Sequence, residues 1–336
     1  MKFSKIKYCF IMAVLIPFSA HGQAGDNVED ISVNTGAGSP YTFSISSFFG
    51  IKYGHAEEIV YKDSGTDAKL SQLLWNIKPL FYWGAAFDFF QRNPMARWGF
   101  FANATLQAGL PARTGVMEDR DWMAAGGGLS HFSSHDNYTE DALFLDISAG
   151  SSIPIGGIMR LKVFAGLSFM SLKWMARDGY FQYASKIGET GTYNDWDSSL
   201  PKVPVYGPGI HYQQDWLIFS PGIAAHIPLF ERFDIGVYFK IGPVIFCYDL
   251  DDHLARNLQF SEFMYGGIML EPKGVFAFSL NERVKFSLDI SYRFMAGARG
   301  DTEVKDTNTN IVQTSKSTGG SSYSALDAAL SVTLVF

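Results

Sequence analysis

The stretch VKFSLDISYRF, which spans Val284–Phe294, alternates between apolar and polar side chains at every position. Successive side chains of an extended segment point to opposite faces, so this pattern predicts a β-strand with one apolar and one polar face. The apolar face would hold Val284, Phe286, Leu288, Ile290, Tyr292 and Phe294, and the polar face Lys285, Ser287, Asp289, Ser291 and Arg293. The segments RFDIGVYFKI (232–241) and WGFFANATLQAGL (98–110) repeat the pattern.

Alternation of this kind runs through most of the chain and predicts about ten strands, near 40–53, 69–90, 98–113, 140–153, 159–174, 215–228, 232–248, 264–280, 284–297 and 320–336. The links between them alternate in length, and the long ones run near 54–68, 114–139, 175–214, 249–263 and 298–319. A soluble sandwich shows the same alternation but has no reason to sort its loops by length. We therefore predict an all-β fold, a single closed antiparallel transmembrane β-barrel with long extracellular loops, short periplasmic turns and a narrow, side-chain-filled lumen.

Composition and the C-terminus support a membrane barrel. The chain has 29 Phe, 16 Tyr and 7 Trp, and no apolar run after the N-terminus is long enough for a transmembrane helix. Aromatic girdles are typical of outer-membrane barrels. The last ten residues, DAALSVTLVF, alternate up to a terminal Phe336, which resembles the C-terminal signature of bacterial outer-membrane barrels. We expect one barrel domain, 23–336, located in the bacterial outer membrane.

The N-terminus predicts export. A basic head, an apolar core and the site Ala20-His21-Gly22 indicate a signal peptide over residues 1–22. Without its three lysines, 24 Lys and Arg remain against 33 Asp and Glu, a net charge of −9. Such a surface disfavours nucleic acid and favours cationic peptides as partners. Cys247 is then the single cysteine, which excludes an internal disulfide, and we expect it to face lipid.

Two acidic segments carry the candidate chemistry. Asp119 and Asp121 lie in VMEDRDWM, and Asp251 and His253 lie in FCYDLDDHLARN. They follow the third and seventh predicted strands, which would lie on nearly opposite walls of a ten-strand ring. A water held between them could lose a proton to His253, oriented by Asp251, while the opposite carboxylates hold and polarise that water. General acid–base help of this kind accelerates a reaction on the order of 100- to 10,000-fold.

Other interpretations stay open for these residues. The cluster could be a solvated loop entry, or its oxygens could bind calcium, although histidine suits calcium poorly. The hydrolytic interpretation needs no metal and no cofactor. It does need a register change, because simple alternation from Ile241 would point Asp251 and His253 towards lipid. A β-bulge at Pro243, which lacks a backbone donor, would turn them inward.

Together the two segments resemble the omptin family, outer-membrane endopeptidases of Gram-negative bacteria. The family's Asp-x-Asp-Trp-Met and Asp-x-His motifs read here as residues 119–123 and 251–253, in order and in matching loops. The stretch GIKYGHAEEIVYKDSGTDAKLSQLLW (50–75) fits the family's first hairpin, and WMARDG (174–179) fits a third segment. The similarity runs over nearly the whole predicted mature chain, thinly between the motifs.

The resemblance implies an aspartyl endopeptidase with its active site facing the cell exterior. It assigns Asp119, Asp121, Asp251 and His253 to catalysis, and Glu58 and Asp249 to an acidic pocket for Arg or Lys before the cleaved bond, often at dibasic sites. The alternative is an inactive barrel of this family that acts as an adhesin or binds peptide or lipid.

The predicted outer wall departs from the family pattern. Where relatives carry polar and basic residues that bind lipopolysaccharide, this chain has Leu167, Phe169, Ser171 and Asp215. We hypothesise that activity in this outer membrane does not depend on lipopolysaccharide.

Overall fold

The computed structural model describes residues 41–336 except 93–97, 157 and 190. The predicted signal peptide, residues 1–22, and the predicted start of the mature chain at Gln23 lie outside these residues. No helix in the described part of the chain is long and apolar enough to cross a bilayer.

The described secondary structure consists of β-strands. Seven are long: β1 (Tyr41–Tyr61), β2 (Lys69–Arg92), β5 (His131–Ile155), β6 (Met159–Tyr183), β10 (Pro208–Phe230), β15 (Val284–Asp306) and β16 (Val312–Val335). Six shorter strands follow one another in pairs: β3 (Gly99–Gly109) with β4 (Ala112–Asp121), β11 (Phe233–Gly242) with β12 (Val244–His253), and β13 (Leu258–Gly266) with β14 (Ile268–Ser279). The small strands β7 (Lys186–Ile187), β8 (Thr192–Tyr193) and β9 (Val203–Pro204) lie in the connection from β6 to β10.

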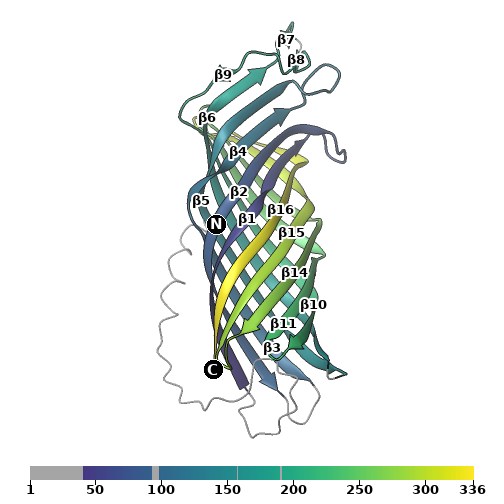
Figure 1. Cartoon of the computed structure of the whole chain (residues 1–336). Coiled ribbons are helices and arrows are strands. Elements are labelled where there is room, and N and C mark those ends of the chain that lie inside the picture. The colour runs from purple at the N-terminus through teal and green to yellow at the C-terminus, as the bar shows by residue number, and fades with distance from the viewer. Residues whose placement is uncertain (1–40, 93–97, 157, 190) are drawn as a thin grey trace.

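Hydrogen bonding runs around a ring of about ten antiparallel strands. The ring follows the chain in the order β1, β2, β3 with β4, β5, β6, β10, β11 with β12, β13 with β14, β15 and β16. β16 then pairs with β1, from Ser44 opposite Val335 to Val60 opposite Gly319. The two ends of the coloured chain, purple and yellow, therefore lie side by side in a tall, tilted ring (Figure 1). Each of these strands has a hydrogen-bonded neighbour on both sides.

Alternation along the strands separates the outside of the ring from its interior. In β15, Phe286, Leu288 and Ile290 are exposed, whereas Ser287 and Asp289 line an internal cavity. The same holds around the ring, where exposed side chains include Phe43, Phe87, Leu106, Val163, Phe219, Phe239 and Leu330. An apolar exterior around a polar interior is the arrangement of a barrel in lipid.

The segments predicted as long loops are mostly strand, so that part of the prediction is wrong. Within 114–139 only residues 122–130 lie outside these strands, because β4 runs to Asp121 and β5 begins at His131. Likewise β12, β13, β15 and β16 continue through most of 249–263 and 298–319. Most outward side chains of these extensions are polar, so the extensions lack the apolar face on which the strand prediction rested. The connection over 184–207 remains long and carries β7, β8 and β9 at one end of the ring (Figure 1).

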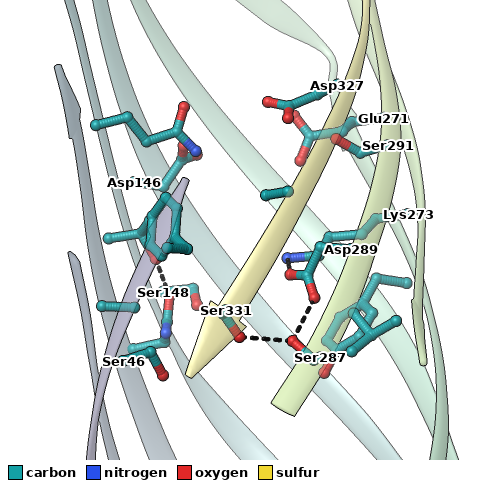
Figure 2. Close-up of a pocket in the computed structure, with 18 of the residues that line it drawn as sticks. Ser46, Asp146, Ser148, Glu271, Lys273, Ser287, Asp289, Ser291, Asp327 and Ser331 are labelled. Atoms are coloured by element: carbon teal, nitrogen blue, oxygen red, sulfur yellow. Dashed lines mark hydrogen bonds and ion pairs between the residues drawn. The ribbon is translucent and has the colours of Figure 1, made fainter. Parts of the chain in front are cut away.

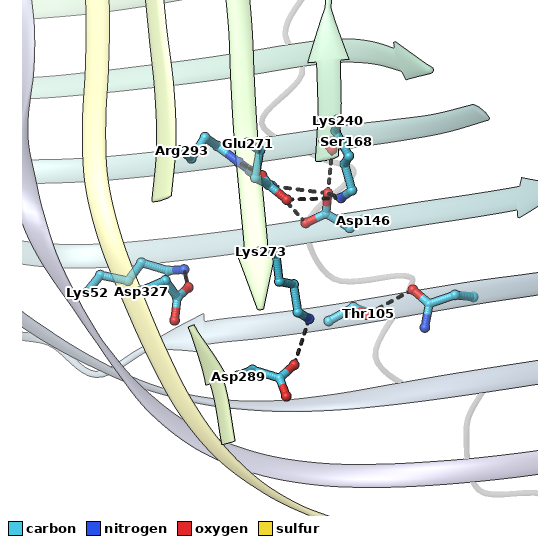
Figure 3. A network of polar contacts seen from close by, with 11 residues as sticks. Lys52, Thr105, Asp146, Ser168, Lys240, Glu271, Lys273, Asp289, Arg293 and Asp327 are labelled. Carbon is cyan, nitrogen blue, oxygen red and sulfur yellow. Dashed lines mark hydrogen bonds and ion pairs between the residues drawn. The ribbon is translucent and has the colours of Figure 1, made fainter. Parts of the chain in front are cut away.

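Charged side chains cross the lower interior. Arg293 Nη2 lies 3.2 Å from Asp146 Oδ1, and Lys240 Nζ lies 3.3 Å from the same oxygen and 3.2 Å from Glu271 Oε1. Arg293 also pairs with Glu271, so four strands are linked across the ring (Figure 3). Ser287 bonds both Asp289 and Ser331 nearby (Figure 2). The cavity around these groups measures about 330 Å³, which fits a lumen filled by side chains.

An apolar plug lies between this charged network and the upper end of the ring. Trp75, Trp174 and Tyr212 stack with centroid separations of 5.0 to 5.9 Å. They belong to one buried cluster with Met117, Trp216, Cys247 and Met295. Along β12 the inward residues run from Ile245 and Cys247 in this cluster to acidic residues above it. The plug thus forms a water-excluding floor beneath the upper opening.

The predicted bulge at Pro243 is present. On β10, Gly222 lies opposite Lys240, but Phe219 lies opposite Val244, so the β11–β12 side has one extra residue across this interval. The shift turns Cys247 inward, where its exposed fraction is 1%. The prediction that Cys247 faces lipid is therefore wrong, since it continued the register of β11 past the bulge.

Cys247 provides a direct test of this register. Deletion of Pro243 removes the extra residue, and we expect β12 rather than β11 to shift, because a shift of β11 would move Lys240 from its ion pairs into lipid. Cys247 should then turn outward and react with an apolar maleimide in intact membranes, whereas in the unmodified protein it should stay unreactive.

The variant Pro243→Ala keeps the residue count and should leave the thiol protected. An unreactive Cys247 in the folded deletion variant would show that the bulge does not set the register of β12.

Candidate active site at the upper rim

The acidic residues lie beyond the apolar band, at the upper end of the ring. On β1 the last strongly exposed aromatic residue is Tyr53, and Glu58 follows it within the polar part of the strand. Outward neighbours at this level are mixed. Asp252 and Asp301 are bonded to Gln259 and Lys316, while Tyr248 and Phe263 are exposed aromatic residues. The site therefore lies at the upper end of the ring, where the exterior is no longer uniformly apolar, and its inner walls come from β1, β4, β12 and β13.

Asp251 and His253 form a hydrogen-bonded pair on β12. His253 Nε2 lies 2.7 Å from Asp251 Oδ2, and the imidazole packs edge-on against Phe260. Asp251 is 1% exposed, and its other oxygen has no hydrogen-bond partner among the described residues. Burial lowers the pKa of His253, but the charge and hydrogen bond of Asp251 outweigh burial and raise it overall. The raised pKa makes the neutral imidazole a stronger proton acceptor, and Asp251 stabilises the imidazolium that forms when His253 takes up a proton.

Asp119 and Asp121 lie on the same face of β4, as their spacing predicts. Ser71 Oγ on β2 donates to Asp119 Oδ1 at 3.5 Å. Burial and then the charge of Asp121 raise the pKa of Asp119 to about 7, while the charge of His253 opposes the rise. The charges of His253 and Asp251 also act on Asp119, and the strand order places β4 and β12 on nearly opposite walls of the ring. One carboxyl of the pair can hold a proton near neutral pH.

Glu58 and Asp249 form a second acidic group beside these residues. Asp249 Oδ2 accepts hydrogen bonds of 3.0 Å from both the Tyr212 hydroxyl and the Ser321 hydroxyl. Glu58 is 2% exposed, and its Oε2 has no partner among the described residues. Burial and the nearby carboxylates raise the pKa of Glu58, and burial raises that of Asp249 to about 8. Among the described residues neither group has a basic partner, which makes the pair a candidate cation pocket.

Several residues of this site were not predicted from the sequence. Glu262 on β13 faces Asp249, and Gln214 bonds the Tyr212 hydroxyl at 2.7 Å and the Glu57 carbonyl at 2.9 Å. Both lie in segments interpreted as loops. The alternation of Phe263 and Tyr265 outward with Glu262 inward is the signal that could have revealed β13. Arg256, in the turn after β12, lies 3.5 Å from His253 Nδ1 and was also missed.

The described residues hold no group of three or more His, Cys, Asp or Glu with the geometry to bind a metal ion. The carboxylates come instead from separate strands and face one another over an apolar floor.

A ring of strands with an apolar exterior and an acidic, histidine-containing rim defines an outer-membrane β-barrel protein with a candidate hydrolytic site. The profile of the Omptin family matches residues 39–336, and the chain belongs to that family. Family membership supports an outer-membrane protease. No curated protein sequence matches the chain.

Three solved structures were compared with the chain. The outer membrane protease OmpT from Escherichia coli matches with a TM-score of 0.76 and 20% identity, over 89% of this chain and 98% of that one. OprG from Pseudomonas aeruginosa matches with a TM-score of 0.35 and 11% identity, over 88% and 95% of the two chains. The toluene transporter TodX from Pseudomonas putida matches with a TM-score of 0.32 and 10% identity, over 89% and 91%. The likeness to OmpT establishes the fold.

The raised pKa of Asp249 predicts a pH-dependent stability. The pKa of Asp249 is about 8 in the folded state and has its ordinary value near 4 in the unfolded state. Between about pH 4 and pH 8 the folded protein therefore binds a proton that the unfolded protein has lost. Stability from this group is therefore present at low pH and is lost as pH rises towards 8. Asp249→Asn should raise the free energy of unfolding at pH 8 by on the order of 1 kcal/mol or more and flatten its decline between pH 5 and 8.

Urea unfolding of protein in detergent micelles, followed by tryptophan fluorescence, measures this effect. Asp63→Asn changes an exposed carboxyl in a turn and should leave the pH profile unchanged. A profile for Asp249→Asn as steep as that of the unmodified protein would contradict the assignment.

Proposed function

We propose that this protein is an endopeptidase that cleaves after Arg or Lys, with a water activated at the rim of a closed transmembrane barrel. The observation that carries the proposal is the pairing of His253 Nε2 with Asp251 Oδ2 at 2.7 Å, opposite Asp119 and Asp121 on another wall. A base with its orienting carboxylate and a facing acidic pair are the groups that water-mediated hydrolysis needs.

The chemistry follows from the protonation of these groups. In the tautomer that donates Nε2–H to Asp251, His253 Nδ1 keeps a lone pair and accepts a proton from the water. The water oxygen attacks the peptide carbonyl carbon, and Asp251 stabilises the imidazolium that forms. As the C–N bond breaks, the imidazolium returns that proton to the leaving amine. Asp119 and Asp121 share a proton, so they can hold the water and donate a hydrogen bond to the developing oxyanion.

Glu58 and Asp249 would bind the basic side chain that precedes the cleaved bond. Both are buried and acidic, and Glu58 Oε2 has no partner among the described residues. A cationic side chain would supply the missing hydrogen bonds and charge compensation. Glu58 and Asp249 hold protons because their pKa values are raised, and a bound cation would displace those protons. Cationic peptides should therefore bind more tightly as pH rises through about 8.

His253→Ala tests the proposal. Removal of the base should lower kcat for a fluorogenic Arg-Arg peptide by about 100- to 10,000-fold, with KM changed little, because the basic pocket remains. The assay uses purified protein in detergent with added outer-membrane lipid.

His135→Ala is the matched control, because His135 bonds the Asp178 carbonyl and Ser133 rather than the acidic groups. It should keep kcat near the unmodified value. No cleavage by the unmodified protein, with saturable peptide binding retained, would favour the alternative of an inactive barrel that binds peptide or lipid.

We also propose that activity does not require lipopolysaccharide. Leu167 is exposed on the outer wall, and Asp215 stands on the neighbouring strand β10, where its carboxylate would repel lipid phosphates. Protein refolded in a lipopolysaccharide-free detergent should reach full activity, and added lipopolysaccharide should leave kcat unchanged. Activity that appears only after lipopolysaccharide is added back would refute this proposal.

A further inference from the structure

Glu262 lies in the inner wall next to the pocket formed by Glu58 and Asp249. It sits directly opposite Asp249 in the β12–β13 pairing and opposite Thr302 in the β13–β15 pairing. Its neighbour Phe263 is strongly exposed on the outside, whereas Glu262 is 1% exposed. The side chain of Glu262 therefore points into the ring, at the level of Asp249.

Neighbouring groups hold one oxygen of Glu262 and leave the other without a donor. Thr302 Oγ1 donates to Oε1 at 2.6 Å, and Thr318 Oγ1 donates to Thr302 Oγ1 at 3.0 Å. The carboxylate lies against Gly319, where a Cβ would come within 2.6 Å of Glu262 Cδ. Oε2 is buried and has no hydrogen-bond partner among the described residues. A buried carboxylate oxygen without a donor is costly unless a ligand supplies one.

The three carboxylates interact as one group. Burial and then the charge of Asp249 raise the pKa of Glu262, and Glu262 in turn contributes to the raised pKa of Glu58. The described hydrogen bonds and ion pairs give none of the three a basic partner. Two free buried oxygens, Glu58 Oε2 and Glu262 Oε2, come from different strands. They would meet a cation from different directions.

We propose that Glu262 is a specificity-determining residue that selects an arginine guanidinium over a lysine ammonium. This inference rests on the proposed function and deepens it. A guanidinium presents five N–H donors in a rigid plane and can bond carboxylates on several walls at once. An ammonium is compact, has three donors and is satisfied by Glu58 and Asp249. The free oxygen of Glu262 therefore matches donors that arginine has and lysine lacks.

Glu262→Gln tests this role, because glutamine keeps the size and the Oε1 acceptor for Thr302 but removes the charge. Two peptides that differ only in Arg or Lys before the cleaved bond are compared. For the Arg peptide, kcat/KM should fall roughly 10- to 100-fold, and for the Lys peptide it should change far less. Glu303→Gln is the matched control, since Glu303 follows Thr302 on β15 but is exposed, and it should leave both values unchanged.

If kcat/KM of Glu262→Gln falls equally for the two peptides, or falls for neither, the inference is overturned. The proposed function still stands in that case, provided that the unmodified protein cleaves the peptides. If the unmodified protein cleaves neither peptide, the proposed function fails, and calorimetric binding of n-butylguanidine and n-pentylamine still tests Glu262. Preference for the guanidine that disappears in Glu262→Gln supports the inference. Equal binding of both probes by the unmodified protein contradicts it.

Discussion

Hydrogen bonding of the backbone around a ring is the constraint on which the rest of this structure depends. Lipid offers no donor or acceptor, so each strand must find partners on both sides, and the pairing of β16 with β1 completes the ring. This arrangement gives every strand an outward and an inward face. The outward face is apolar, and the inward face is left to hold charges, aromatic side chains and the candidate site. The geometry of the site thus follows from a ring whose formation is required by backbone hydrogen bonding in lipid.

The interior is layered along the axis, and each layer has a separate physical role. The lower network around Asp146 and Arg293 neutralises buried charges by pairing them across four strands. The plug around Trp75 and Tyr212 then excludes water from the middle of the ring. Above it, Glu58, Asp249 and Glu262 have no basic partner among the described residues, and burial and mutual repulsion raise their pKa values. This contrast between paired charges below and unpaired charges above supports the proposed roles of the upper group in cation binding and proton transfer.

One extra residue connects the membrane-facing part of the chain to the site. Without the shift at Pro243, the alternation that places Phe239 and Ile241 outward would also place Asp249 and Asp251 outward. The shift lets β11 and β12, one continuous stretch of chain, place apolar side chains outward in the bilayer and acidic side chains inward above it. The same shift carries Cys247 into the plug, directly beneath Asp249. Bulges next to functional sites commonly re-aim side chains in this way.

The sequence alone determined the all-β class, the strands within the apolar band and the family, because period-two alternation and motif spacing are local properties of the chain. It also indicated the bulge, since a proline interrupts the alternation there. It did not reveal that β4, β12, β15 and β16 continue above the apolar band, because their polar outward side chains lack that pattern, and the outward Phe263 and Tyr265 that mark β13 were overlooked. Nor could it find Glu262, Ser321 and Gln214, or the inward side of Cys247. Those depend on which residues of distant strands lie opposite one another, and only the register of the whole ring decides that.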